Sequence, residues 1–285
     1  MVQSPMMPSQ AIILFLSLLA SGCLADLRSN DLVVDGIAPA QVTLARASMK
    51  RMLTAHGGLE RWKNHRVAEV GYTDTWFRPL EQAVSMPYPE NGQRISQTIL
   101  LGANASRWTF VGGPWDGLEW GIQRWATYTA KNGKIAFEPD SDIKFWLPTN
   151  AYFFEAPFRL GEANVMAHMG TAHIDGQTLD MVFLTWGQAE PQSNVDQYVA
   201  FIDRQSGRLT YLQYTIRDIF RTLIGVMHYS DYKEVDGIWV AHRMTVVTEP
   251  GGPPALHEYR IQDLAFGGDV PQEKLIPDPN KAGRK

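Results

Sequence analysis

Two tight-turn signals in the second half of the chain constrain the fold more than any other feature. The segment Asp203–Gly207 interrupts the β-rich run "DQYVAFIDRQSGRLTYLQYTIRD", and the pair Asp236–Gly237 interrupts "YSDYKEVDGIWVAHRM". An Asp-Gly pair, or a glycine at a positive-φ bulge position, is typical of short β-hairpin loops. Consecutive hairpins join neighbouring antiparallel strands, so they predict a meander rather than a sheet with helical crossovers.

Similar β-rich runs begin at Arg66 and fill the first half. "RVAEVGYTDTWF", "GQRISQTILLG", "ASRWTFVGG" and "LEWGIQRWATYTA" are separated by Gly, Pro and Asn, as successive strands are, and "TLDMVFLTWG" and "LHEYRIQDLAF" follow later. The sequence shows no internal repeat of solenoid or propeller length. The prediction is an α+β fold, mainly antiparallel β, with about ten strands.

Several of these strands are apolar on both sides. In "DMVFLTW", Met181 and Phe183 lie on one face, whereas Val182, Leu184 and Trp186 lie on the other. A strand with one face in water alternates between polar and apolar residues, and this one does not. Both faces of the sheet therefore need apolar cover.

A helix is predicted before the first strand. Val42, Ala45, Met49, Met52 and Leu53 recur at intervals of three and four residues after Pro39, which suits a first helical turn. His56 and the following two glycines suggest a catalytic or metal role, but Gly57 is better explained as the left-handed residue that ends the helix.

A second, strongly aromatic segment breaks the β pattern. "SDIKFWLPTNAYFFEAPFRLGEAN" carries two prolines, Pro148 and Pro157, which argue against a continuous helix. We expect one or two short helical turns in a long connection. Because the segment is so apolar, we expect it to cover the concave face of the sheet together with the helix.

The sequence favours no particular chemistry. It lacks a Gly-x-Ser-x-Gly elbow, a Gly-rich phosphate loop and a His-Glu-x-x-His helix. None of the seven histidines is spaced for metal binding on one element. His168 and His173 flank Gly170 and could meet in space, but a metal site would need a third ligand. We expect no catalytic residue, no metal and no cofactor. A net charge of −4 and a pI near 6.0 argue against a nucleic-acid partner.

The N-terminus carries a separate signal. Residues 11–20 form an apolar run that is too short to span a bilayer, and Cys23, the only cysteine, follows it. "LASGC" resembles a bacterial lipoprotein lipobox, which implies that residues 1–22 are a signal peptide and that Cys23 carries a diacylglyceryl thioether and an acylated amine. The alternative is an ordinary signal peptide cut elsewhere.

This signal suggests a division of the whole chain. Residues 23–39 would be a lipid anchor and a flexible tether of about 20 Å, 40–270 the folded β-rich domain, and 271–285 a polar tail. By analogy with enteric bacterial sorting, Leu24 in place of Asp favours the periplasmic face of the outer membrane.

Several segments resemble one group of proteins. "AHGGLERW", "YFFEAPFRLGEAN", "DQYVAFIDRQSGRLTYLQYT" and "YSDYKEVDGIWVAHRM" look like an uncharacterised group of bacterial exported proteins. That group is similar to the superfamily of the outer-membrane lipoprotein-sorting carrier and receptor. The resemblance covers most of residues 40–266. It implies a curled antiparallel half-barrel closed by helices, whose concave face binds acyl chains.

The aromatic content fits such a role. Nine Trp, ten Tyr and twelve Phe either fill a wide core or line an apolar cavity. We therefore expect an outer-membrane lipoprotein that binds or transports a lipid, isoprenoid or acyl chain, with a possible envelope protein as partner. The alternatives are a secreted hydrolase or isomerase acting on an apolar substrate, and a non-catalytic envelope scaffold. The expected ligand-lining residues are Trp76, Trp108, Trp120, Trp125, Trp146, Phe153, Phe154, Phe158, Met181 and Phe183.

Overall fold

The computed structural model describes residues 24–217 and 219–267 of the chain. Cys23, the expected signal peptide (1–22) and the expected polar tail (271–285) lie outside the described residues. The helices are α1 (Asn30–Val34), α2 (Pro39–Ala55), α3 (Leu59–Asn64), α4 (Pro79–Ser85) and α5 (Ser141–Arg159), and a 3₁₀ turn, η1 (Leu160–Glu162), follows α5.

The strands form one large antiparallel sheet, as the hairpin signals predict. Their bounds are β1 (Val67–Trp76), β2 (Arg94–Leu100), β3 (Ala105–Val111), β4 (Glu119–Gln123), β5 (Ala126–Lys131), β6 (Lys134–Ala136), β7 (Val165–Ile174), β8 (Gln177–Thr185), β9 (Tyr198–Asp203), β10 (Leu209–Ile216), β11 (Phe220–Val235), β12 (Ile238–Val247) and β13 (Pro254–Gly267). The sheet therefore has 13 strands, whereas about ten were expected.

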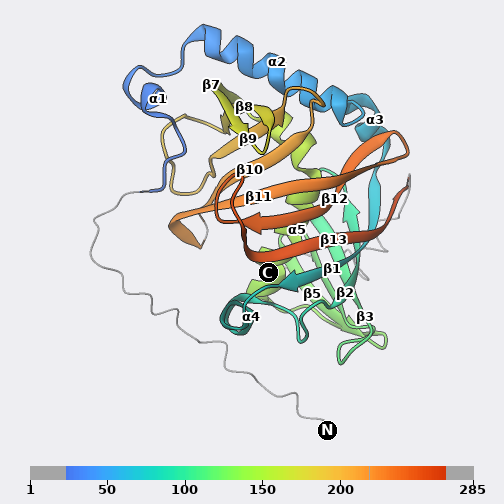
Figure 1. Cartoon of the computed structure of the whole chain (residues 1–285). Coiled ribbons are helices and arrows are strands. Elements are labelled where there is room, and N and C mark those ends of the chain that lie inside the picture. Colours follow the sequence, from blue (N-terminus) through green and yellow to red (C-terminus); the bar gives the residue numbers. More distant parts are fainter. Residues whose placement is uncertain (1–23, 218, 268–285) are drawn as a thin grey trace, which may run out of the picture.

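The strand order shows how the sheet is assembled. It runs β6-β5-β4-β3-β2-β1-β13-β12-β11-β10-β9-β8-β7, so two meanders meet where β1 pairs with β13. The segment that links the two meanders is α5, which lies behind the curled sheet in the view of Figure 1. The sheet is open and curved, and the expected half-barrel is confirmed.

Both predicted hairpins are present. Gly207 has φ 75° in the turn between β9 and β10. Asp236 and Gly237 have φ 50° and 76° and join β11 to β12, as a type I′ turn requires.

The predicted helix is α2, and it ends as its sequence indicates. Gly57 follows the helix with φ 108°. His56 is buried: its Nδ1 lies 2.8 Å from the Trp239 carbonyl oxygen, and its Nε2 accepts the Leu209 N–H at 3.3 Å. Burial lowers the pKa of His56 to about 4, so the ring remains neutral and links α2 to the sheet.

The sheet has an apolar core on each face. The larger core fills the concave side, beneath α2 and α5. The smaller core lies on the opposite face of β7–β12 and includes Leu27 and Leu32, which precede and form α1.

The expected flexible tether is therefore corrected in part. The Leu27 N–H donates to Gln197 Oε1 at 3.0 Å, and the Ala25 N–H donates to the Arg221 carbonyl at 2.9 Å. The physical reason is that the convex face is itself apolar and requires cover, which residues 25–37 supply.

Candidate functional site

The contact between α5 and the concave face of the sheet is the candidate site. Asp140 begins α5, because its Oδ1 accepts the backbone N–H groups of Asp142 and Ile143 at 2.9 Å each. The apolar face of the helix then packs against β3 and β4. The expected position of this aromatic segment is confirmed.

Its conformation differs from the expectation, because α5 is one helix of 19 residues with Pro148 and Pro157 inside it. A proline removes a backbone donor and leaves the carbonyl four residues earlier without its helical partner. For Pro157 that carbonyl belongs to Phe153, and it accepts the Tyr229 hydroxyl at 3.2 Å. An interior proline costs about 3 kcal/mol, but each buried large apolar side chain contributes about 1.5–3 kcal/mol. Burial of α5 therefore outweighs the prolines.

Seven of the expected ligand-lining residues come together in this contact. They share the larger core: Trp76, Trp108, Trp120, Trp146, Phe153, Phe154 and Phe158. Their rings pack on one another and on neighbouring rings. Trp108 and Trp120 are stacked with centroids 6.0 Å apart, and Phe158 stacks on Trp62 at 4.1 Å. The aromatic residues thus fill most of the concavity that they were expected to line.

The three other expected residues lie elsewhere. Trp125 has φ 64° in the turn between β4 and β5, and 59% of its surface is exposed. Met181 and Phe183 point to the convex face and belong to the smaller core. The alternation within β8 correctly separates the two faces, but nothing in the sequence says which face is concave.

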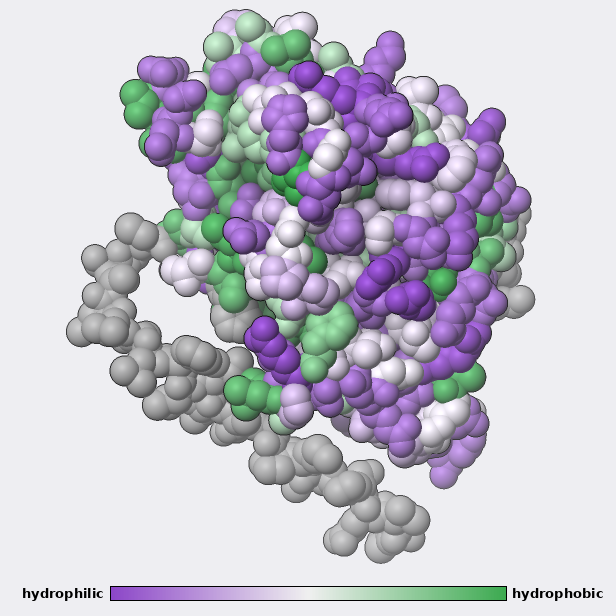
Figure 2. All heavy atoms as spheres, in the orientation of Figure 1, coloured by the Kyte–Doolittle hydropathy of each residue, from purple (hydrophilic) through white to green (hydrophobic). Residues whose placement is uncertain are grey.

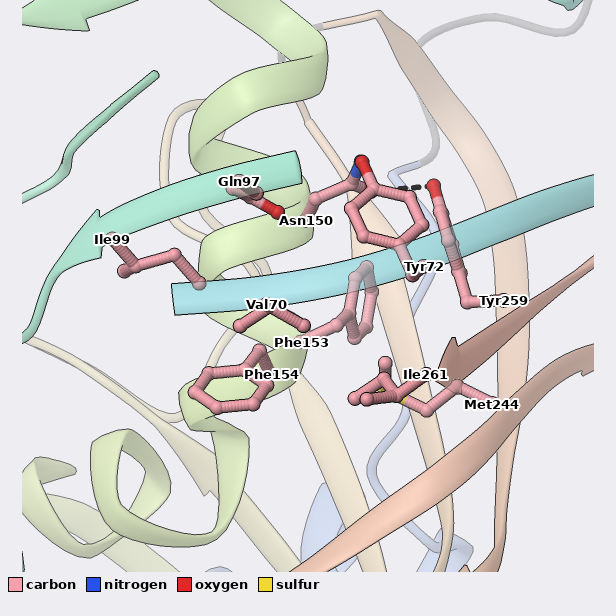
Figure 3. A pocket seen from close by; sticks show the side chains of 10 residues that line it. All are labelled: Val70, Tyr72, Gln97, Ile99, Asn150, Phe153, Phe154, Met244, Tyr259 and Ile261. Carbon is pink, nitrogen blue, oxygen red and sulfur yellow. Dashed lines mark hydrogen bonds between the residues drawn. The ribbon is translucent and has the colours of Figure 1, made fainter. Parts of the chain in front are cut away.

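Two small cavities lie along α5. The first has a volume of about 20 Å³ and is enclosed by α5, β1, β2, β12 and β13; Figure 3 shows its lining, Val70, Tyr72, Gln97, Ile99, Asn150, Phe153, Phe154, Met244, Tyr259 and Ile261. The second, of about 10 Å³, lies nearer the C-terminal end of α5. A single water needs about 10–15 Å³, so neither cavity holds a lipid as it stands.

Phe154 and Met244 line both cavities. One side chain from α5 and one from β12 therefore border both spaces.

Polar groups lie in the wall of the first cavity, and sequence reasoning missed them. Asn150 of α5 donates to the Tyr72 hydroxyl at 3.2 Å and accepts the Tyr259 hydroxyl (Figure 3). Nε2 of buried Gln97 has no hydrogen-bond partner among the described residues. A polar residue at an inward position of an apolar run, such as Asn150 in "LPTNAYFF", was the available signal.

A buried carboxyl group lies further along α5. Glu155 accepts the Gly102 N–H at 2.7 Å, and burial raises the pKa of its carboxyl group to about 7. The helix therefore carries a group that changes charge near neutral pH inside its contact with the rest of the domain.

A second buried cluster centres on Asp74. His257 Nδ1 lies 2.8 Å from its Oδ1, and the Tyr88 hydroxyl and Trp76 Nε1 donate to its Oδ2 at 2.8 and 3.1 Å. His257 is stacked on Trp76 with centroids 4.6 Å apart. This arrangement resembles an Asp–His pair, but aromatic rings enclose it and neither of the two cavities touches it.

The other candidate histidines lie away from α5. His168 Nε2 is 3.3 Å from Asp180 Oδ1, beside the Arg51 and Ser48 side chains of α2 that also bind Asp180. His228 stacks on Tyr211, a residue of the smaller core. Within residues 24–217 and 219–267, no three His, Cys, Asp or Glu side chains form a group that would hold a metal ion.

Among the helices in the described part of the chain, none has the length and apolar character needed to cross a bilayer.

No family model matches the chain, and no curated protein matches it. Its fold is similar to that of a DUF1329 family protein from Desulfovibrio piger, with TM-score 0.52 and 10% identity over 82% of this chain and 97% of that one. It also matches a putative outer membrane lipoprotein-sorting protein domain from Vibrio parahaemolyticus (TM-score 0.48, 11% identity, 80% and 97%). A LolA superfamily protein from Nitrosomonas europaea matches similarly (TM-score 0.48, 10% identity, 84% and 97%). At 10% identity, the match to the Desulfovibrio piger protein shows a similarity of fold alone.

Proposed function

We propose that this protein is a lipoprotein of the bacterial envelope that binds a hydrophobic molecule between α5 and the concave face of its sheet. The ligand is a lipid, an isoprenoid or an acyl chain. The anchor is a lipid on Cys23, which holds the domain on the periplasmic face of the outer membrane. The observation that carries this proposal is that the apolar helix α5, bordered by two small cavities, covers the part of the concave face formed by β1–β4.

Because side chains fill the concavity in this structure, a ligand binds there only when α5 moves away from the sheet. A helix of 19 residues is about 28 Å long, at 1.5 Å per residue. One leaflet of a bilayer has a hydrocarbon thickness of about 15 Å, half of the roughly 30 Å core. The part of the concave face that α5 covers is therefore long enough for a whole acyl chain.

Two features of the contact make α5 a suitable movable cover. Its two prolines remove backbone hydrogen bonds that would otherwise stiffen the helix. Its contact with the sheet also includes buried polar groups, among them Asn150 and Glu155, which would find partners in water if the helix moved.

Replacement of α5 by a ligand on the concave face favours long ligands. Each buried methylene contributes about 0.8 kcal/mol, so a chain gains affinity with length while the free energy needed to displace α5 stays the same. We expect long acyl chains to bind and short ones to fail.

Native mass spectrometry of the full chain, gently extracted from membranes, tests the binding. A retained lipid supports the proposal. A second measurement follows α5 itself. Spin labels are placed at Lys144→Cys on α5 and Glu69→Cys on β1 in a Cys23→Ser background, and palmitic acid is added as the probe. The expected result is a longer distance between the labels. A chain that retains no lipid and shows an unchanged distance with saturating palmitic acid contradicts the proposal.

The filled concavity favours one second candidate, an envelope scaffold in which α5 never moves and the outer surface binds a protein partner. The same two measurements separate the candidates, since the scaffold predicts neither retained lipid nor movement of α5.

A further inference from the structure

The end of the β10–β11 hairpin exposes apolar side chains. Ile219, Leu223 and Ile224 are 47%, 43% and 43% exposed. Figure 2 shows hydrophobic atoms on the left of the molecule, where this hairpin ends in Figure 1. We call these three side chains the hairpin tip.

The backbone makes this end protrude. In the register of the two strands, Thr215 is opposite Ile224, but the next residue, Ile216, is opposite Phe220. Residues 221–223 of β11 thus have no opposite residues on β10, and the strand bulges there. The exposed apolar side chains lie on and beside this bulge.

The start of the described chain is fixed to the same place. The Ala25 N–H donates to the Arg221 carbonyl at 2.9 Å. The buried Arg217 guanidinium donates to the Ala25 carbonyl and, at 2.9 Å, to the Arg221 carbonyl. Two of these hydrogen bonds connect the N-terminal segment with the hairpin end, and the third lies within the hairpin.

Cys23 precedes Ala25 by two residues. Two residues span at most about 7 Å, so a lipid on Cys23 would hold the hairpin end against the headgroups of the bilayer. A flexible tether of about 20 Å, as first expected, would have left the orientation of the domain free.

We propose that the hairpin tip is a membrane-docking surface. Ile219, Leu223 and Ile224 enter the boundary between headgroups and acyl chains, and the exposed Arg221 side chain faces the lipid phosphates. The lipid anchor and the hairpin tip together fix the orientation of the domain on the membrane. This inference rests on the anchor of the proposed function, but not on a ligand beneath α5.

The experiment uses the mature chain, residues 23–285. Because Cys23 is the only cysteine, a maleimide phospholipid couples there alone. The vesicles contain phosphatidylethanolamine and phosphatidylglycerol. Amide hydrogen exchange is compared between the coupled and the free chain. We expect exchange at residues 219–224 to slow by at least about tenfold on coupling, and exchange in β3–β6 to be unchanged.

A pair of triple variants in an uncoupled Cys23→Ser chain measures binding by the hairpin tip alone. The test variant is Ile219→Ser, Leu223→Ser and Ile224→Ser. The matched control is Val111→Ser, Trp125→Ser and Ile135→Ser, three other exposed apolar residues. We expect vesicle binding to fall about tenfold or more in the test variant and to remain at the parent level in the control. Thermal unfolding of both variants establishes that they fold.

Equal exchange at residues 219–224 with and without coupling, or equal vesicle binding by the two variants, overturns the docking surface. A wrong proposal for the lipid anchor on Cys23 would give a different result. Mass spectrometry would then find Cys23 unacylated or absent from the native protein, whereas the chemically coupled chain would still dock.

Discussion

Replacing Phe154 by alanine tests the filled concavity directly. Its ring is buried and borders both cavities, so its removal adds space between them. A buried Phe→Ala change costs about 3–5 kcal/mol, and little relaxation is expected where cavities already exist. For a domain of this size each kcal/mol lowers Tm by about 2–4 °C, so we expect a loss of roughly 6–20 °C.

Palmitic acid should then restore stability. A ligand that binds only the folded chain stabilises it by about 2.7 kcal/mol at a hundred times its Kd. Phe183→Ala is the matched control, because Phe183 is also buried but lies in the smaller core on the opposite face. It should lose similar stability and gain no more from palmitic acid than the parent chain does. Thermal unfolding followed by circular dichroism measures both effects.

Two results would refute this reasoning. A loss below about 1 kcal/mol in Phe154→Ala would mean that α5 does not pack on the sheet as described. An equal response of both variants to palmitic acid would mean that the fatty acid binds any loosened core rather than the space beneath α5.

Three further predictions concern stability. Burial raises the Glu155 pKa from 4.5 to about 7, so its contribution to stability, roughly 3 kcal/mol, is present below about pH 4.5 and lost as pH rises through 7. Glu155→Gln should remove this dependence in urea unfolding between pH 4.5 and 8. Burial alone would raise the pKa of Asp180, but hydrogen bonds from arginine side chains outweigh it and hold the pKa at about 2. The stability from Asp180 is therefore present above about pH 4 and lost as pH falls toward 2, and Asp180→Asn should cost about 2–3 kcal/mol in unfolding at pH 7 and flatten the acid limb. Gly57→Ala should lower the free energy of unfolding by more than about 2 kcal/mol, because its Cβ would lie 2.3 Å from the Gly237 carbonyl oxygen. In the control Gly58→Ala the new Cβ meets no atom within 4 Å, so the loss should be about 1 kcal/mol. Equal losses in urea unfolding of the two variants would exclude the clash.

Local signals in the sequence predict the hairpins, α2 and the open sheet. The Asp236–Gly237 turn and the helix end at Gly57 depend on backbone conformations that few other residues adopt, so the residue types at these positions reveal them. The continuous α5 was not predictable in this way. Local rules of helix formation include the free-energy cost of Pro148 and Pro157. They do not include tertiary contacts such as the hydrogen bond from the Tyr229 hydroxyl to the Phe153 carbonyl.

The candidate site was predictable only in part, for a similar reason. Alternation separates Phe183 from Leu184, but the curvature that makes one face concave comes from the whole sheet. The sequence also predicts that aromatic residues gather beneath α5. Whether they line a hollow or fill it depends on how closely the helix approaches the strands, and no pattern of residues encodes that distance.

The pairing of β1 with β13 has a consequence for how the molecule is made. These strands hold the two meanders together, yet among the described residues one is the first strand and the other the last. Until β13 arrives, β1 and β12 each present an open row of backbone donors and acceptors that a neighbouring chain can capture. A chain whose paired strands are so far apart in the sequence folds slowly, and it is most prone to aggregate until β13 has paired with β1.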